Sequence, residues 1–289
     1  MNLADINQIK SLLSKEGFSF KKSLGQNFLI NPDVCPAMAD AATNKNCGVL
    51  EIGPGAGVLT RELCLRAKRV VAIELDGRLK PVLSKTLAEF DNVKVIFGDA
   101  MKLDLETVIK ENFADCERVD ICANLPYYIT SPIVMRLLES RLPVNSITVM
   151  VQKEAAERLC AAVGTRDAGA VTVAVSYFAE SEILFEVSRD SFLPAPNVDS
   201  AVIRLNIREN PPVKVQDEKA FFAFVKACFA QRRKTLLNTV SSTLKIDKGF
   251  LKECLGKLSL KETVRGEELD MDTLAAFSNM LVSIQNKNE

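Results

Sequence analysis

The fold is decided by the stretch Val49-Leu50-Glu51-Ile52-Gly53-Pro54-Gly55-Ala56-Gly57. Its first four residues predict a buried strand, and its alternating glycines predict a turn in which the backbone approaches a ligand closely. A helix is expected next, because Leu59, Leu63 and Ala67 recur on one stripe. Glycine turns of this kind open many α/β folds, so the stretch predicts an open α/β sheet without yet indicating its ligand.

Strands and helices alternate on the C-terminal side of this turn. Strands are predicted at 69–73, 93–97, 119–123 and 147–151, and helices at 79–87 and 133–138. The alternation predicts a mainly parallel, doubly wound sheet, since parallel neighbours need a crossover connection. The apolar runs 171–178 and 201–207 are also strand-like, and we expect them to pair as antiparallel edge strands.

The pattern changes near Glu209-Asn210-Pro211-Pro212, where a proline pair after a strand predicts a linker. Beyond it the apolar spacing becomes helical, and a last helix is expected to begin near Asp270 or Asp272. We therefore expect two domains: a catalytic domain at 1–209 and a small helical domain at 210–289.

Composition restricts the class of protein. The 289 residues are 47% hydrophobic and 26% charged, and no apolar run approaches the roughly 20 residues that span a bilayer. The polar N-terminus lacks the pattern of a signal peptide. Eight scattered cysteines without paired metal spacing indicate buried thiols in a reducing cytoplasm, and the absence of histidine excludes Ser-His and Cys-His catalysis. We expect a cytoplasmic protein with neither a membrane nor a metal partner.

Acidic residues stand at the ends of three successive predicted strands. They are Glu51, Glu74 and Asp99, and the carboxyl ends of parallel strands meet at one edge of a sheet. Glu74 is placed to accept the hydroxyls of a ribose, and Asp99 to accept an adenine amine. The glycine spacing G-x-G-x-G disfavours a nicotinamide dehydrogenase, whose fingerprint is G-x-G-x-x-G. An anionic pocket also suits a cationic sulfonium better than a pyrophosphate.

A second motif, Asn124-Leu125-Pro126-Tyr127, follows the strand predicted at 119–123. The Asn124 side-chain oxygen and a main-chain carbonyl of Leu125 or Pro126 are suited to accept the two N–H bonds of an exocyclic nucleobase amine. Pro126 has no N–H and a fixed φ, which helps hold the turn open. Tyr127 offers an aromatic face for stacking. The tetrad therefore indicates methylation of a base such as adenine at N6.

Any nucleic-acid footprint on this chain must be local. Lys and Arg together number 37, as do Asp and Glu, whereas RNA binding through phosphates usually needs a basic surface. The candidate clusters are Lys21-Lys22, Arg204 with Arg208, and Arg232-Arg233-Lys234.

Taken together, these motifs resemble the rRNA adenine N6-dimethyltransferases. The resemblance extends from about Phe20 to the last predicted helix. It rests on 21–29 (KKSLGQNFL), the glycine turn, the tetrad with Tyr128-Ile129, the run 192–201 (FLPAPNVDSA) and the segment around Gln231 to Lys234. Within the family, the chain is most similar to the bacterial enzymes that dimethylate two adjacent adenosines near the 3′ end of 16S rRNA.

The resemblance implies a Rossmann-like, seven-stranded sheet, S-adenosylmethionine as donor, and an N-terminal segment that covers this cofactor. It also implies 16S rRNA in the 30S subunit or its precursor as partner, with a monomeric enzyme. The implied cofactor contacts are Gln26, Asn27, Leu29, Glu51, Gly53, Gly55, Glu74, Leu75, Asp99, Ala100 and Asn124. The implied catalytic residues are Asn124, Leu125, Pro126, Tyr127 and Phe192, with the last two sandwiching the target base. The implied RNA contacts are Lys21, Lys22, Arg232, Arg233 and Lys234.

Three alternatives remain open at this point. The nearest is a 23S rRNA adenine methyltransferase of the macrolide-resistance type, which shares most motifs. The second is a non-enzymatic RNA-binding assembly factor on the same fold, against which the intact tetrad and acidic strand ends argue. The third is the nicotinamide dehydrogenase disfavoured by the glycine spacing.

Overall fold

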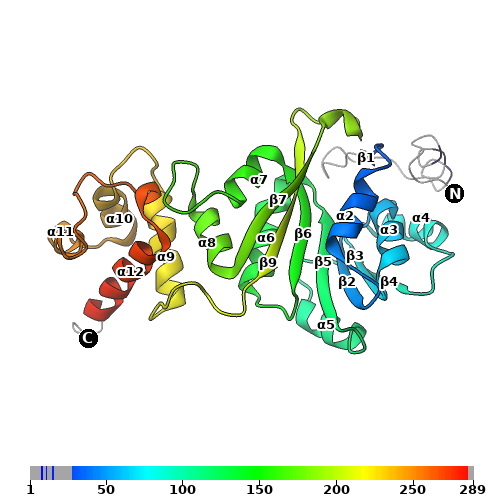
Figure 1. Cartoon of the computed structure of the whole chain (residues 1–289), viewed down its shortest axis with the longest axis horizontal. Coiled ribbons are helices and arrows are strands. Elements are labelled where there is room, and N and C mark those ends of the chain that lie inside the picture. The colour runs from blue at the N-terminus through cyan, green and yellow to red at the C-terminus, as the bar shows by residue number, and fades with distance from the viewer. Residues whose placement is uncertain (1–7, 9–10, 12–14, 16–27, 286–289) are drawn as a thin grey trace. The chain divides into compact units, whose positions relative to one another are not determined.

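The computed structural model describes residues 8, 11, 15 and 28–285 (Figure 1). The chain divides into two compact units. The first comprises Met1–Ala156 with Ser181–Ile207, and the second comprises Glu157–Glu180 with Arg208–Glu289. The domains expected from the sequence, 1–209 and 210–289, differ from these units in the assignment of 157–180 and of 208–209.

A single large sheet organises the first unit. Within the described residues it has seven strands in the order β4-β3-β2-β5-β6-β9-β7 (Figure 1). Strands β2 to β6 pair in parallel, and β9 returns antiparallel to β6. Their bounds are Cys47–Ile52 (β2), Arg69–Glu74 (β3), Val93–Phe97 (β4), Arg118–Asn124 (β5), Ser146–Gln152 (β6), Ala179–Val187 (β7) and Ser200–Ile207 (β9). The predicted α/β sheet is confirmed.

The central strands are buried on both faces, as expected for parallel strands flanked by helices. All six residues of β2 are buried. One face packs against α2 (Val34–Ala42) and α3 (Val58–Arg66), where Met38 and Leu63 share a core cluster with Val49 of β2. The remaining helices of this part are α4 (Lys80–Thr86), α5 (Leu105–Asn112), α6 (Thr130–Glu139) and α7 (Lys153–Leu159).

A two-stranded sheet lies outside the large one. Strand β1 (Phe28–Leu29) pairs antiparallel with β8 (Phe192–Leu193), so Leu29 lies opposite Phe192. The Ile30 amide also donates to the Ser191 carbonyl at 2.8 Å. Two segments more than 160 residues apart in sequence are therefore joined beside the sheet.

The prediction of a strand at 171–178 was wrong. These residues form helix α8 (Ala170–Phe178), which begins where the Gly169 amide donates to the Thr172 hydroxyl at 2.9 Å. An apolar run that is buried nearly all round has no periodicity to separate helix from strand. The run 201–207 does form a strand, but as β9 it pairs with β6 instead of with 171–178.

The second unit is helical after residue 208. Its further helices are α9 (Glu218–Phe229), α10 (Leu236–Leu244), α11 (Lys248–Lys257) and α12 (Met271–Gln285). Phe224 of α9 stacks on Phe277 of α12 with ring centroids 5.0 Å apart. The Asp270 carboxylate accepts the Thr273 amide at 2.8 Å, so the helix expected near Asp270 is confirmed with that residue at its start. None of the described helices is long and apolar enough to cross a membrane.

Candidate active site

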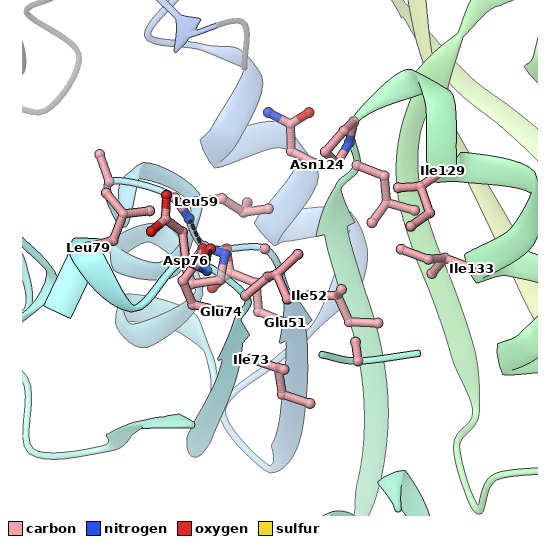
Figure 2. A pocket seen from close by; sticks show the side chains of 18 of the residues that line it. Glu51, Ile52, Leu59, Ile73, Glu74, Asp76, Leu79, Asn124, Ile129 and Ile133 are labelled. Carbon is pink, nitrogen blue, oxygen red and sulfur yellow. Dashed lines mark hydrogen bonds between the residues drawn. The ribbon is translucent and has the colours of Figure 1, made fainter. Parts of the chain in front are cut away.

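A cavity of about 470 Å³ opens at the carboxyl ends of β2, β3, β4 and β5, within the first unit (Figure 2). Its size falls in the range of small-molecule sites. Every implied cofactor or catalytic residue that the structure describes lines it. These are Leu29, Glu51, Gly53, Gly55, Glu74, Leu75, Asp99, Ala100, Asn124, Leu125, Pro126, Tyr127 and Phe192.

The glycine turn between β2 and α3 requires its glycines for their conformation. Gly53, Gly55 and Gly57 have φ of 74°, 59° and 87°, a region that other residues rarely adopt. A Cβ at Gly53 or Gly55 would meet no atom within 4 Å, so backbone geometry is the constraint there. With no side chains on either residue, this wall of the cavity is main chain.

The Glu74 carboxylate is fixed by two backbone amides. Its Oε2 accepts the Gly55 amide at 3.0 Å, and its Oε1 accepts the Asp76 amide at 2.8 Å. The side chain is buried, and burial raises its pKa, which the two amide bonds partly oppose. Figure 2 shows Glu51, Glu74 and Asp76 grouped together, while Asn124 stands apart at the end of β5. The acids therefore occupy one region of the cavity and the tetrad another.

Glu51 is the most deeply buried acid of the cavity, at 1% exposure. Burial raises its pKa to about 8, and the neighbouring Glu74 carboxylate acts in the same direction. Its Oε2 has no hydrogen-bond partner within 3.5 Å among the described residues, although the neighbouring Thr60 hydroxyl acts to lower the Glu51 pKa. A buried carboxyl oxygen without a close partner favours a ligand that brings a hydrogen-bonding group.

Asp99 begins a loop that an arginine holds against α6. Asp99 Oδ1 accepts the Met101 amide at 2.9 Å. Arg136 of α6 donates to the carbonyls of Ala100 at 3.2 Å and Leu103 at 2.9 Å. Sequence reasoning did not find Arg136, because an arginine on an amphipathic helix is typical of a solvated face.

The tetrad lies at the end of β5 and turns into α6. Asn124 is partly exposed and Leu125 is buried. The Pro126 carbonyl accepts the Ile129 amide at 3.1 Å and the Thr130 hydroxyl at 3.3 Å. Its acceptor capacity is used within the turn, which leaves the Leu125 carbonyl as the better acceptor for a ligand.

Tyr127 and Phe192 reach the cavity from different elements. The Tyr127 hydroxyl lies 2.7 Å from the Ser200 hydroxyl, and burial raises the Tyr127 pKa. Phe192 is only 3% exposed and packs in the core cluster that includes Leu29. Ser200 was not identified as a site residue from the sequence, because nothing local connects it to the tetrad.

The expected RNA contacts lie elsewhere or outside the described residues. Lys21, Lys22, Gln26 and Asn27 are not among the residues that the structure describes. Arg232, Arg233 and Lys234 are exposed in a turn between α9 and α10 of the second unit, and Arg232 donates to the Ala168 carbonyl at 3.1 Å. Arg204 and Arg208 instead face Glu182 and Glu180 of β7, at 3.9 and 2.9 Å.

The described residues around the cavity offer no metal site. Among the described residues, no group of three or more Cys, Asp or Glu side chains has the geometry to hold a metal ion, and the chain has no histidine. The thiol of Cys35 lines the cavity, and burial raises its pKa to about 12.

Comparison with known families identifies the family of the chain. The model of the family described as "Ribosomal RNA adenine dimethylase" matches residues 17–271. The chain belongs to this family. The adenine dimethylase resemblance predicted from the sequence is therefore confirmed.

Relatives in the dimethylase family match this chain along almost its whole length. "Ribosomal RNA small subunit methyltransferase A" of Geobacillus thermodenitrificans is 49% identical, over 98% of both chains. The protein of the same description from Bacillus pumilus is 46% identical, over 94% of both chains. These are methyltransferases, and the nicotinamide dehydrogenase alternative is not favoured.

Solved methyltransferase structures share the fold. A dimethyladenosine transferase from Plasmodium falciparum is 28% identical, with a TM-score of 0.72 over 90% of this chain and 98% of its own. The 23S rRNA methyltransferase ErmE is 26% identical, with a TM-score of 0.66 over 89% of this chain and 100% of its own. The fold is therefore shared with a dimethyladenosine transferase and with a 23S rRNA methyltransferase, and fold alone does not select the substrate.

Proposed function

We propose that this protein transfers methyl groups from S-adenosylmethionine to N6 of two adjacent adenosines near the 3′ end of 16S rRNA, in the 30S subunit or its precursor. The observation that carries the proposal is one shared cavity. The tetrad from Asn124 to Tyr127 lines the same space as the glycine turn and Glu74. The choice of the small-subunit RNA is supported by the relatives described as small subunit methyltransferase A, at up to 49% identity in the cases given above.

The residues of the cavity fit this methyl donor. When bound, S-adenosylmethionine supplies a methyl group attached to a positively charged sulfur, and this sulfur is a good leaving group because it becomes a neutral thioether. Glu51 provides the unpartnered buried oxygen, and Glu74 and Asp99 provide further acceptors at neighbouring strand ends. We assign Glu74 to the ribose and Asp99 to the adenine, flanked by Leu75 and Ala100. Gln26 and Asn27, outside the described residues, remain assigned to the methionine end with Leu29.

The target amine is held by the tetrad. Asn124 accepts one N–H of the adenine N6, and the Leu125 carbonyl accepts the other, because the Pro126 carbonyl already serves the turn. These two acceptors favour a pyramidal, more nucleophilic nitrogen. Tyr127 and Phe192 stack on the base and set its approach to the donor.

No general base is required of the chain. The methylated ammonium loses its proton readily to water, so the residues act by positioning and by preorganised charge. This agrees with a chain that contains no histidine. Because dimethylation repeats the reaction on a monomethylated amine, one of the two N–H contacts is absent in the second transfer.

RNA recognition is assigned to exposed basic residues that do not line the cavity. We propose Arg232, Arg233 and Lys234 in the turn after α9, together with Lys21 and Lys22 outside the described residues, as contacts to rRNA phosphates. The protein acts as a monomer in this proposal.

The test is incubation with labelled S-adenosylmethionine and unmethylated 30S or 50S particles, followed by mapping of the label. We expect two adjacent dimethylated adenosines in 16S rRNA and no label on 50S. Label on 23S rRNA instead would favour the macrolide-resistance type of enzyme. Cofactor binding without labelling of either particle would favour a binding protein that has lost catalysis. Asn124→Ala serves as the inactive control.

A further inference from the structure

The hydroxyl groups of Tyr127 and Ser200 link the tetrad to strand β9 of the sheet. Their oxygens lie 2.7 Å apart, and the two residues are separated by 73 positions in sequence. Ser200 is fully buried, and Tyr127 is partly buried at the cavity. Either hydroxyl is able to donate.

Ser200 itself is held firmly. It is the first residue of β9, where it pairs with Gln152 of β6. The preceding residue, Asp199, accepts the Lys153 amide at 3.0 Å through its carbonyl and the Arg189 amide at 2.9 Å through Oδ1. The backbone that carries the Ser200 hydroxyl is therefore fixed at the start of β9, between β6 and β7.

Tyr127 lies in a short turn of the backbone. It begins the single 3-10 turn Tyr127–Ile129, between the end of β5 and α6. A tyrosine in such a turn keeps freedom at χ1 and χ2 unless its ring or hydroxyl is anchored. The bond to Ser200 supplies that anchor at the outer end of the ring.

The same segment of chain carries the other aromatic residue of the base site. Phe192 lies eight positions before Ser200, on β8, and is packed against Leu29. One stretch, 192–200, therefore contributes Phe192 directly and reaches Tyr127 through a hydroxyl.

We propose that Ser200 is a positioning residue, which holds the Tyr127 ring parallel to the base and matters most for the second methyl transfer. This inference rests on the proposed function. In the first transfer the amine is oriented by two N–H contacts, whereas the monomethylated amine retains only one. Orientation in the second round therefore depends more on the aromatic rings, and a loosened Tyr127 leaves monomethyladenosine behind.

The experiment compares Ser200→Ala, Tyr127→Phe and the double variant, with intact protein and unmethylated 30S subunits. Mass spectrometry measures the ratio of N6,N6-dimethyladenosine to N6-methyladenosine at matched times. We expect each single variant to slow the second transfer by roughly three- to tenfold, the range of one hydrogen bond, and the first transfer less. The double variant should match the single ones, because both remove the same bond.

A matched control is Ser146→Ala, which removes another buried serine bond, the 2.8 Å contact to Asp120 on β5. Ser146 does not line the cavity. For this control we expect a loss of melting temperature similar to that of Ser200→Ala, with an unchanged ratio of dimethylated to monomethylated adenosine. If Ser146→Ala shifts the ratio as much as Ser200→Ala does, the effect is general destabilisation and the proposal is overturned.

Two other results also overturn it. One is a double variant in which the second transfer slows by the product of the two single-variant factors. The other is a wild-type ratio in Tyr127→Phe, a variant that remains informative even if Ser200→Ala fails to fold. Failure of the proposed function is distinguishable, because then the wild-type protein itself forms no dimethyladenosine in 16S rRNA.

Discussion

Oε2 of Glu74 lies 3.0 Å from the amide nitrogen of Gly55, so the acid at the end of β3 holds the glycine turn at the end of β2. The carboxylate also accepts the Asp76 amide. Two walls of the cavity are thereby joined through one side chain. Loss of Glu74 removes an acceptor for the ligand and also releases the turn beside it.

Glu74→Ala is expected to weaken S-adenosylmethionine binding by about 1.5–3 kcal/mol, the range for loss of a charge-assisted hydrogen bond. Glu74→Gln should lose less, because its amide oxygen still accepts one backbone N–H. Isothermal calorimetry on folded protein is the measurement. Glu106→Gln, in an exposed pair with Lys110, is the control. Unchanged affinity in Glu74→Ala would remove this residue from the ribose role.

Arg136→Met is expected to raise the dissociation constant for S-adenosylmethionine about three- to tenfold, because it frees the loop from Asp99 to Leu103. Lys102→Met is the control on the same loop. Its pair with Asp99 spans 3.7 Å and its side chain is 84% exposed, so it contributes little. Equal effects of the two variants would show that charge, and not the carbonyl contacts, supports binding.

Tyr127→Ala and Phe192→Leu should lose activity on 30S subunits while cofactor affinity stays near normal, since stacking is worth about 1–3 kcal/mol per base. Leucine replaces Phe192 because the ring is buried in the core, where truncation to alanine costs about 3–5 kcal/mol of stability. Steady-state kinetics with each substrate varied separates the two effects. Normal RNA kinetics with weakened cofactor binding would contradict the base sandwich.

Glu51 should make stability fall as pH rises. Its pKa is raised from 4.5 to about 8 in the folded chain, so between these values the folded form keeps a proton that the unfolded form has lost. The free energy of unfolding therefore decreases with rising pH across this window, by at most about 1.4 kcal/mol per pH unit, and levels off above it. Calorimetric melting of wild type and Glu51→Gln from pH 5 to pH 8 tests this. An equally steep dependence in Glu51→Gln would assign it to other groups.

Arg233→Glu with Lys234→Glu should raise the Michaelis constant for 30S subunits and flatten its salt dependence by about one unit per charge removed, with cofactor binding unchanged. Both side chains are exposed, and no carboxylate within residues 28–285 forms an ion pair with either. Arg232 is left in place because it donates to the Ala168 carbonyl. An unchanged salt slope would direct the search to Lys21 and Lys22.

The parts of the site that sequence predicted are those fixed by strand topology. Glu51, Glu74, Asp99 and Asn124 each follow from their place at the end of a strand, and the structure puts all four at one cavity. The run 171–178 was misassigned because an apolar segment without alternation fits a buried helix equally well.

The contacts that sequence could not predict join residues far apart along the chain. Arg136 reaches the Ala100 carbonyl across 36 positions, and Ser200 meets Tyr127 across 73. No periodicity or motif encodes such a pair, because the contact depends on how two elements that are distant in sequence pack against each other. The assignment of the Leu125 carbonyl, instead of the Pro126 carbonyl, as the acceptor likewise depends on the hydrogen bonds within the turn.

The second unit is built from two separate stretches, 157–180 and 208–289, and this limits how it can be exchanged. Tyr177 and Phe178 of α8 pack against Phe221 and Phe222 of α9, so the aromatic core of the unit is shared by both stretches. A protein truncated after residue 207 would retain α8 without the rings that cover it. The C-terminal region is therefore not a detachable module: shortening the chain there should give an aggregation-prone product, and a graft between relatives must transfer both stretches together.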